Sequence, residues 1–294
     1  YYQYKKNNKD AWAVTLFFLL TGLAIVVYTN HKPYEPRERD YAFVGSFYAY
    51  AIWIGIGALG LWDTRRTKMS PMVASYLVLG VTMLAVPVRM AAENWDDHNR
   101  SNRYTARDIA KAYLDSCEPN AILFTNGDND TFPLWYVQAV EGYRTDVRIL
   151  NLSLLNTDWY IDQQRRAAYD GEAVPFSFEW NQYVQGTRDV LYYRDLGVKG
   201  RWDVKDFVQF TKRDDAQVKF KTSGNKELPL YPQKKLRINI DKEAVFANGV
   251  VDVKDSASVV DYIDWNWKSN VITKRDLMVI DLIANNNWER PIYF

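Results

Sequence analysis

The first ninety residues contain three long stretches without a charged side chain. They cover residues 11–28, 41–62 and 69–88, which are 18, 22 and 20 residues long. About 20 apolar residues in a helix span the roughly 30 Å hydrocarbon core of a bilayer. A spanning segment must be helical because lipid offers the backbone no hydrogen-bond partners. The sequence therefore predicts three transmembrane helices, at about residues 11–29, 41–62 and 69–89.

The charge balance differs between these ninety residues and the rest of the chain. Residues 1–90 contain ten Lys or Arg and five Asp or Glu. Residues 91–294 contain twenty-seven Lys or Arg and thirty-one Asp or Glu. A mildly acidic second part argues against binding to nucleic acid, which requires a clustered basic face. About 200 residues can bury a core of their own, and the single Cys117 excludes an intrachain disulfide. We predict a transmembrane region at 1–90 and an external domain at 91–294.

The charges beside the first two stretches favour one orientation. Loop 30–40 mixes three basic with three acidic residues, whereas basic residues predominate before the first stretch and between the second and third. These basic residues are Lys5, Lys6, Lys9, Arg65, Arg66 and Lys68. By the positive-inside bias, both segments face the cytoplasm. We expect loop 30–40 and the domain after residue 90 to face the periplasm in a bacterium, or the lumen in a eukaryote.

The external domain alternates between strand and helix signals. Residues 105–117 and 158–169 have helical patterns, and residues 121–125 and 147–154 are apolar runs typical of buried strands. Short links between such elements favour parallel strands joined by crossover helices. The predicted fold is therefore an α-helical membrane region followed by an α/β domain with a partly parallel sheet.

Capping residues mark where the helices of this domain begin. Thr105 with Asp108, and Thr273 with Asp276, have the spacing of a capping box. Thr131 follows a polar turn and is expected to cap a helix that continues to about residue 140. A strand is expected at 236–240 and another at 291–294. Residues 172–232 are rich in aromatic side chains but have no clear periodicity, and we assign no elements there.

The turn after the first strand is the sharpest candidate site. In open α/β sheets, ligands bind beyond the carboxyl ends of strands, where this turn lies. Carboxylates there could hold a divalent cation or accept hydrogen bonds from a hydroxylated ligand. The alternative is that these residues only shape the turn and cap the helix. The candidates are Asn126, Asp128, Asn129, Asp130 and Thr131, with Asp128 and Asp130 as the only metal-ligand candidates.

A second candidate lies in the loop at the predicted membrane face. Arginine forks suit phosphate oxygens, and an interfacial loop can reach a phosphate carried on a lipid. The alternative is that the charges mark the membrane boundary and pair with one another in water. The residues are Arg37, Glu38, Arg39 and Asp40.

A third polar cluster follows the third stretch directly. A histidine beside two aspartates has the ligand types for a metal, but near-consecutive residues do not converge easily on one ion. A membrane-proximal hinge rich in hydrogen bonds is the alternative. The residues are Asp96, Asp97, His98, Arg100 and Arg103.

Four longer blocks resemble one known family. They are residues 37–48, 120–136, 146–155 and 285–294, of which the second reads NAILFTNGDNDTFPLWY. The chain is similar to the bacterial branch of a polytopic family of unknown function related to transmembrane protein 260, an animal protein O-mannosyltransferase. The chain begins without a Met and ends in an apolar, strand-like run, so we expect it to be a fragment.

The resemblance implies a glycosyltransferase of the C superfamily in the bacterial inner membrane. Such enzymes use a polyprenyl-phosphate-linked sugar as donor and act on the periplasmic side. Their essential acidic residue usually lies in the first external loop, so we expect it upstream and name no catalytic residue. Arg37 and Arg39 would hold donor phosphate. By analogy with the oligosaccharyltransferase catalytic subunit, Asp128 or Asp130 would hold the acceptor.

The expected function is transfer of a sugar from a polyprenyl-phosphate donor to a protein or glycan acceptor. The sequence requires no cofactor, although a divalent cation would fit, and we expect no nucleic-acid partner. The alternative is a non-enzymatic scaffold, anchored in the membrane, whose periplasmic α/β domain binds a partner. In that case the aromatic-rich residues 172–202 would form the contact surface.

Overall fold

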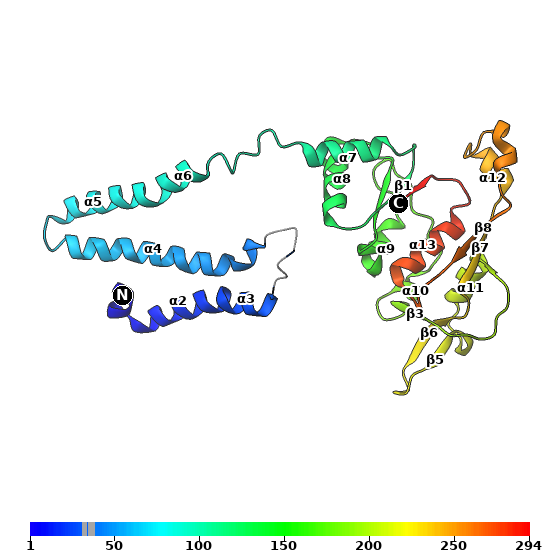
Figure 1. Cartoon of the computed structure of the whole chain (residues 1–294), viewed down its shortest axis with the longest axis horizontal. Helices are drawn as coiled ribbons and strands as arrows, with labels where there is room; N and C mark the ends of the chain where they lie inside the picture. The colour runs from blue at the N-terminus through cyan, green and yellow to red at the C-terminus, as the bar shows by residue number, and fades with distance from the viewer. Residues whose placement is uncertain (31–33, 35–38) are drawn as a thin grey trace. The chain divides into compact units, whose positions relative to one another are not determined.

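A computed structural model of the chain describes residues 1–30, 34 and 39–294. These residues form two compact units, Tyr1–Asn102 and Arg103–Phe294. Figure 1 shows a purely helical first unit and a second unit of helices and strands. The structure thus confirms the predicted fold class.

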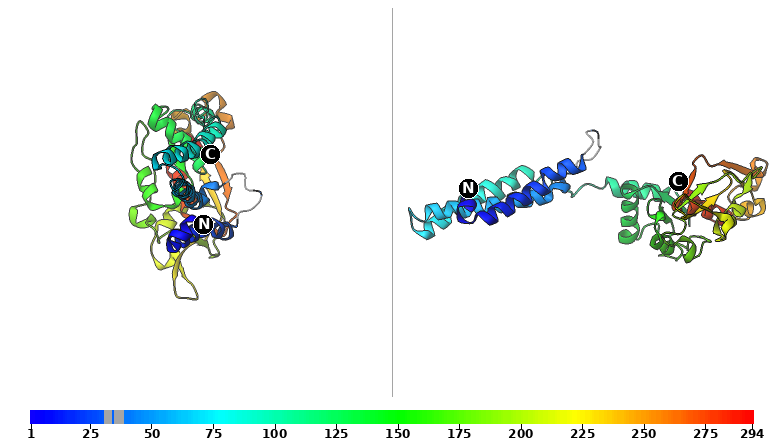
Figure 2. Two further views of the ribbon diagram at one scale, coloured as in Figure 1. Left: turned by 90° about the vertical axis from the view of Figure 1, so that its left-hand side faces the viewer. Right: turned by 90° about the horizontal axis from the view of Figure 1, so that it is seen from below.

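Three helices among the described residues are long and apolar enough to cross a membrane. They are Asn8–Thr29, Asp40–Arg65 and Pro71–Asn94, each a few residues longer than predicted. Figure 2 shows them running side by side, and the second contacts both others. Their elements are α1 (Tyr2–Lys6), α2 (Asn8–Thr21), α3 (Leu23–Thr29), η1 (Asp40–Phe43), α4 (Val44–Arg65), α5 (Pro71–Met83), η2 (Leu84–Val88) and α6 (Arg89–Asn94).

Small residues allow the first two spanning helices to approach closely. A Cβ atom on Gly45 would lie 2.7 Å from the Cβ of Thr21, and one on Gly22 would lie 3.1 Å from the Cβ of Ser46. Close backbone approach at small residues is the usual way that helices associate in lipid. Gly22 also separates α2 from α3. In the third span, Pro87 lies in the π-helical turn η2, because proline cannot supply the regular helical hydrogen bond.

An acidic residue joins two of the basic segments used to predict orientation. Asp63, near the end of α4, lies 3.1 Å from Lys6 Nζ and 2.6 Å from Arg66 Nη2. It also accepts a hydrogen bond from the hydroxyl of Tyr2. The segment before the first span and the loop after the second therefore meet at one end of the helical unit, as the predicted topology requires.

The second unit contains a three-stranded parallel sheet in the order β10-β1-β2. The helices α7 (Thr105–Asp115) and α8 (Asp128–Glu141) cover one face, where Leu123 and Ile149 join their core. On the other face, Phe124 and Leu150 belong to the larger core, which includes α9 (Asp158–Gln164) and α13 (Lys274–Asn285). The strands are β1 (Ile122–Thr125), β2 (Arg148–Asn151) and β10 (Ile292–Tyr293).

Two smaller sheets and several short helices make up the rest of this unit, drawn from yellow-green to orange in Figure 1. Their strand orders are β5-β6-β3-β9 and β4-β7-β8. The strands are β3 (Val190–Tyr193), β4 (Trp202–Asp203), β5 (Lys219–Lys221), β6 (Glu227–Tyr231), β7 (Lys235–Asn239), β8 (Tyr262–Asn266) and β9 (Val271–Thr273). The remaining helices are α10 (Trp180–Tyr183), α11 (Val204–Lys212), α12 (Lys242–Ala247), η3 (Leu154–Asn156), η4 (Ala216–Val218) and η5 (Val253–Ser258).

The structure confirms some local predictions and corrects others. Thr273 and Asp276 form the predicted capping box at the start of α13. Thr105 does not cap α7, because the helix already begins at this residue. The helix predicted at 158–169 ends at Gln164, whose carbonyl accepts a hydrogen bond from the Val174 backbone. The chain thus turns back earlier than the sequence pattern indicates.

The aromatic segment expected as a contact surface contributes largely to the core. Phe176, Phe178 and Tyr183 are buried, whereas Trp180 is about half exposed, at 48 %. Apolar burial is the main favourable term in folding, so these rings stabilise the second unit. Packing therefore explains much of the aromatic content of this segment, whereas the contact surface of the alternative scaffold function stays a prediction that rests on exposed rings such as Trp180.

Candidate functional site

The predicted turn lies at the carboxyl end of the parallel sheet, but Thr131 does not cap α8. The helix begins three residues earlier, with Gly127 at the N-cap position. Thr131 is fully buried, its Oγ1 lies 2.6 Å from Thr125 Oγ1, and it accepts a 2.9 Å hydrogen bond from Asn151 Nδ2. The hydroxyl therefore ties the ends of β1 and β2 to the first turn of α8.

The other residues of the turn are arranged around the start of α8. Asp130 accepts a 2.8 Å hydrogen bond from the Asn126 backbone N–H, which closes the turn. Asp128 and Asn129 are exposed, and both aspartates lie in the first helical turn. The positive end of the helix dipole stabilises carboxylates there. The turn therefore presents hydrogen-bond acceptors and an amide at the edge where α/β folds bind ligands.

A pocket of about 450 Å³ adjoins this turn. Asn126 and Asp130 contribute polar groups, and the last turn of α7 forms another wall. The remaining lining is Tyr113, Ser116, Cys117, Leu123, Phe124, Thr125, Leu134, Leu152, Tyr293 and Phe294. An apolar cavity with a few polar groups is the usual form of a small-ligand site. Burial raises the pKa of the Cys117 thiol, so this side chain is a neutral part of the wall.

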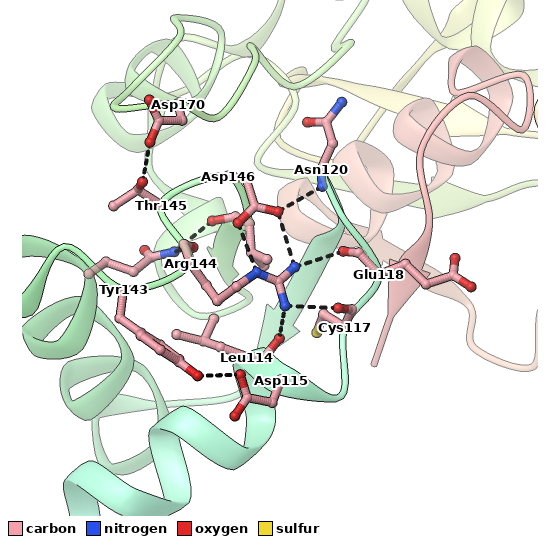
Figure 3. Close-up of polar contacts among 12 residues, drawn as sticks. Leu114, Asp115, Cys117, Glu118, Asn120, Tyr143, Arg144, Thr145, Asp146 and Asp170 are labelled. Carbon is pink, nitrogen blue, oxygen red and sulfur yellow. Dashed lines mark hydrogen bonds and ion pairs between the residues drawn. The ribbon is translucent and has the colours of Figure 1, made fainter.

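Arg144 holds the wall formed by α7 in place (Figure 3). Its guanidinium donates hydrogen bonds to the carbonyl of Leu114 in the last turn of α7 and to those of Cys117 and Glu118, which follow the helix. It also forms a two-point pair with Asp146, at 2.9 and 3.0 Å. A cation at a helix carboxyl end satisfies carbonyls that lack helical partners. The same guanidinium lowers the pKa of Asp146, which also accepts a hydrogen bond from the Asn120 backbone.

The described residues contain no cluster of three or more His, Cys, Asp or Glu that could hold a metal ion. Asp128 and Asp130 alone supply two carboxylates, and Asp130 already accepts a hydrogen bond from the Asn126 backbone. Ca²⁺ takes six to eight oxygen ligands, so further ligands would have to complete such a site. A cation at the turn stays a prediction.

The other predicted site residues lie in the first unit or at its boundary. Arg37 and Glu38 are outside the described residues. Asp40 is exposed in the first turn of η1, and Arg39 directly precedes it. The membrane-proximal residues Asp96, Asp97, His98, Arg100 and Arg103 are all exposed, in the turns and extended chain that follow α6.

The sequence pattern missed a second pocket, which contains a buried arginine. Arg148 is 6 % exposed and lies in β2, between apolar residues. A charged residue within a buried strand is uncommon because burial of a charge is costly. An arginine within an apolar run is thus the signal in the sequence that could indicate this pocket. The prediction of a strand at residues 147–154 does not use it.

The helices and the α/β unit together define a membrane protein with an additional folded domain. Residues 106–294 match the family model of TMEM260-associated domain 2, and the chain belongs to this family. The match supports the resemblance to transmembrane protein 260 noted in the sequence. No curated protein and no solved structure matches the chain.

Proposed function

We propose that the chain is part of an integral-membrane glycosyltransferase. The enzyme transfers a sugar from a polyprenyl-phosphate donor to a protein or glycan acceptor on the periplasmic side of a bacterial inner membrane. The observation that carries this proposal is the presence of three apolar helices and a TMEM260-associated domain in one chain. A lipid-linked donor is confined to the bilayer, so an enzyme that combines membrane helices with an external domain can reach both this donor and a water-soluble acceptor.

The proposed donor site is the start of the second spanning helix. Asp40 is the first residue of this helix, and Arg39 directly precedes it, which supports a position for both at the membrane interface. Arg37 and Arg39 would hold the donor phosphate, and Glu38 and Asp40 would orient the guanidinium groups. A fixed positive charge stabilises the phosphate as it leaves the sugar.

The proposed acceptor site is the pocket at the carboxyl end of β1. Asp130 lines this pocket, and Asp128 and Asn129 are exposed on the same turn. The two carboxylates would accept hydrogen bonds from hydroxyl or amide groups of the acceptor, and the Asn129 amide would donate one. Support comes from the closed turn between Asn126 and Asp130 and from the adjoining pocket of about 450 Å³. Thr131 serves as a support, because its buried hydroxyl fixes the strand ends beneath the turn.

The donor proposal is tested with one arginine at each end of the same helix. Arg39→Ala in the complete protein, in native membranes, should lower kcat/KM for a labelled polyprenyl-phospho-sugar about 10²- to 10³-fold. Arg65→Ala is the matched control, because Arg65 is exposed at the opposite end of the helix Asp40–Arg65. Equal activity of both variants, at equal amounts of inserted protein, would show that Arg39 does not bind the donor phosphate.

A further inference from the structure

The second pocket of the α/β unit has a volume of about 380 Å³ and lies between α8, β2 and α9. Its lining combines flat aromatic rings with amides and one cation. The side chains that matter here are Trp135, Arg148, Trp159, Gln163, Gln164 and Tyr169. Small-ligand pockets range from about 300 to 1,000 Å³, so this one suits a ligand of one or two rings.

The pocket borders the free edge of β2, but side chains block this edge. Gln138 Nε2 donates a 2.8 Å hydrogen bond to the Val147 carbonyl. The Tyr160 hydroxyl donates to the Ile149 carbonyl at 3.2 Å and accepts from the Asn151 N–H at 3.0 Å. An added strand needs unpaired backbone groups. A peptide that extends the sheet is therefore a poor occupant for this pocket.

Arg148 supplies the charge of the pocket. Its Nη2 donates a 2.6 Å hydrogen bond to Gln164 Oε1, and its buried Nε has no partner among the described residues. No carboxylate among the described residues forms an ion pair with it. Burial, with a smaller contribution from the positive charge of Arg148, lowers the pKa of the buried Arg290 guanidinium. A buried charge without a counter-ion costs several kcal/mol. This cost is recovered if an anionic ligand enters the pocket.

The aromatic rings supply flat apolar surfaces beside this cation. Trp159 is 54 % and Tyr169 is 70 % exposed, and Trp135 is half-buried. Exposed Trp and Tyr rings suit ligands that are apolar on one face and polar at the rim. A sugar ring has this form, since its C–H groups can lie on an indole while its hydroxyls reach amides such as Gln163.

We propose that this pocket binds an acidic sugar, with its carboxylate on Arg148 and its ring against Trp159. One guanidinium can hold one carboxylate through two parallel hydrogen bonds and neutralise its single charge, whereas it would leave a dianionic phosphate with a net negative charge. The proposal concerns binding only. Binding of the acidic sugar does not depend on sugar transfer. Either the binding proposal or the proposed glycosyltransferase function can therefore be disproved without the other.

The test compares two sugars that differ only in the carboxylate. Methyl β-glucuronide and methyl β-glucoside are titrated by saturation-transfer NMR against the full chain in lipid nanodiscs, which avoids sugar-based detergents. The glucuronide should bind about 10- to 100-fold more tightly, as a charge-assisted hydrogen-bonded pair would give. Arg148→Gln should remove this preference, whereas Arg166→Gln, on the exposed surface after α9, should keep it.

A second variant covers the case in which Arg148→Gln does not fold. Trp159→Ala removes an exposed ring and should weaken binding of both sugars while thermal unfolding stays unchanged. Equal binding of the two sugars by the wild-type chain, or no binding of either, would overturn the proposal. So would unchanged glucuronide binding in Trp159→Ala. Inorganic phosphate that displaces the glucuronide at equal concentration would indicate a general oxyanion site and would also contradict it.

Discussion

Asn151 donates a 2.9 Å hydrogen bond from its Nδ2 to the Oγ1 of Thr131, deep in the α/β unit. Asn151 ends β2 and Thr131 lies in the first turn of α8, so this bond joins the end of the second strand to the helix that begins in the predicted turn. The Thr125 hydroxyl at the end of β1 lies 2.6 Å from the same oxygen. The consecutive elements β1, α8 and β2 therefore meet at the buried hydroxyl of Thr131.

We expect Thr131→Val to destabilise the second unit although the side chains have the same shape. The substitution leaves Thr125 and Asn151 with an unsatisfied buried group, which costs about 1–3 kcal/mol in the free energy of unfolding. Urea unfolding followed by circular dichroism measures this loss. Thr105→Val is the control, because Thr105 is exposed at the start of α7. An equal stability of the two variants would contradict the supporting role of Thr131.

Arg144→Ala should weaken the packing of α7 against the sheet. The variant loses hydrogen bonds to three backbone carbonyls and the pair with Asp146. Charge-assisted hydrogen bonds of this kind contribute about 1.5–3 kcal/mol to stability. Hydrogen exchange should show faster opening of α7 in the variant. Arg166→Ala, which removes only an exposed i,i+4 pair with Asp162, should leave the exchange of α7 unchanged.

The Arg144–Asp146 pair also predicts a pH dependence. The neighbouring guanidinium lowers the pKa of Asp146 in the folded state, whereas an unfolded Asp has a pKa of about 3.9. The pair's stabilisation is therefore complete above pH ~3.9 and is lost as the pH falls through the folded-state pKa. The stability gap between wild type and Asp146→Asn should narrow in this acidic range. If the difference in free energy of unfolding stays constant from neutral to acidic pH, protonation of Asp146 does not control the stability of the pair.

The proposed orientation can be checked with single cysteines. In a Cys117→Ser background, Ser116→Cys places an exposed thiol at the end of α7, and Lys68→Cys places one in the loop after α4. The positive-inside bias predicts that a membrane-impermeant maleimide labels position 116 in spheroplasts. Position 68 should react only after permeabilisation. The reverse pattern would show that the α/β unit faces the cytoplasm.

The sequence predicts the start of a helix best where the capping residues bind each other within one helical turn. Thr273 and Asp276 form the expected capping box because each partner is only three residues away. Thr105 and Asp108 have the same spacing but do not form one, since the backbone enters its helix one residue earlier. Capping patterns therefore predict a helix more reliably than they predict its first residue.

The segment 172–232 has no clear periodicity because its strands are short and pair with distant residues. β3 pairs with β6 and with β9, whose register joins Leu191 to Ile272. Such strands are stabilised by distant neighbours and not by their own periodicity. The same reason explains why the pocket around Arg148 was missed. Arg148 and Gln164 meet only after β2 and α9 have packed together.

The parallel pairing of β1 with β10 determines when this unit can fold. Arg290, just before β10, donates a hydrogen bond to the carbonyl of Asn120, 170 residues earlier in the chain. During synthesis, one edge of β1 therefore stays unpaired until residues 292 and 293 have been made and can pair with it. Contacts of such long sequence separation form slowly. Until then, the unpaired backbone groups on this edge can pair with another extended segment, which is a route to misfolding.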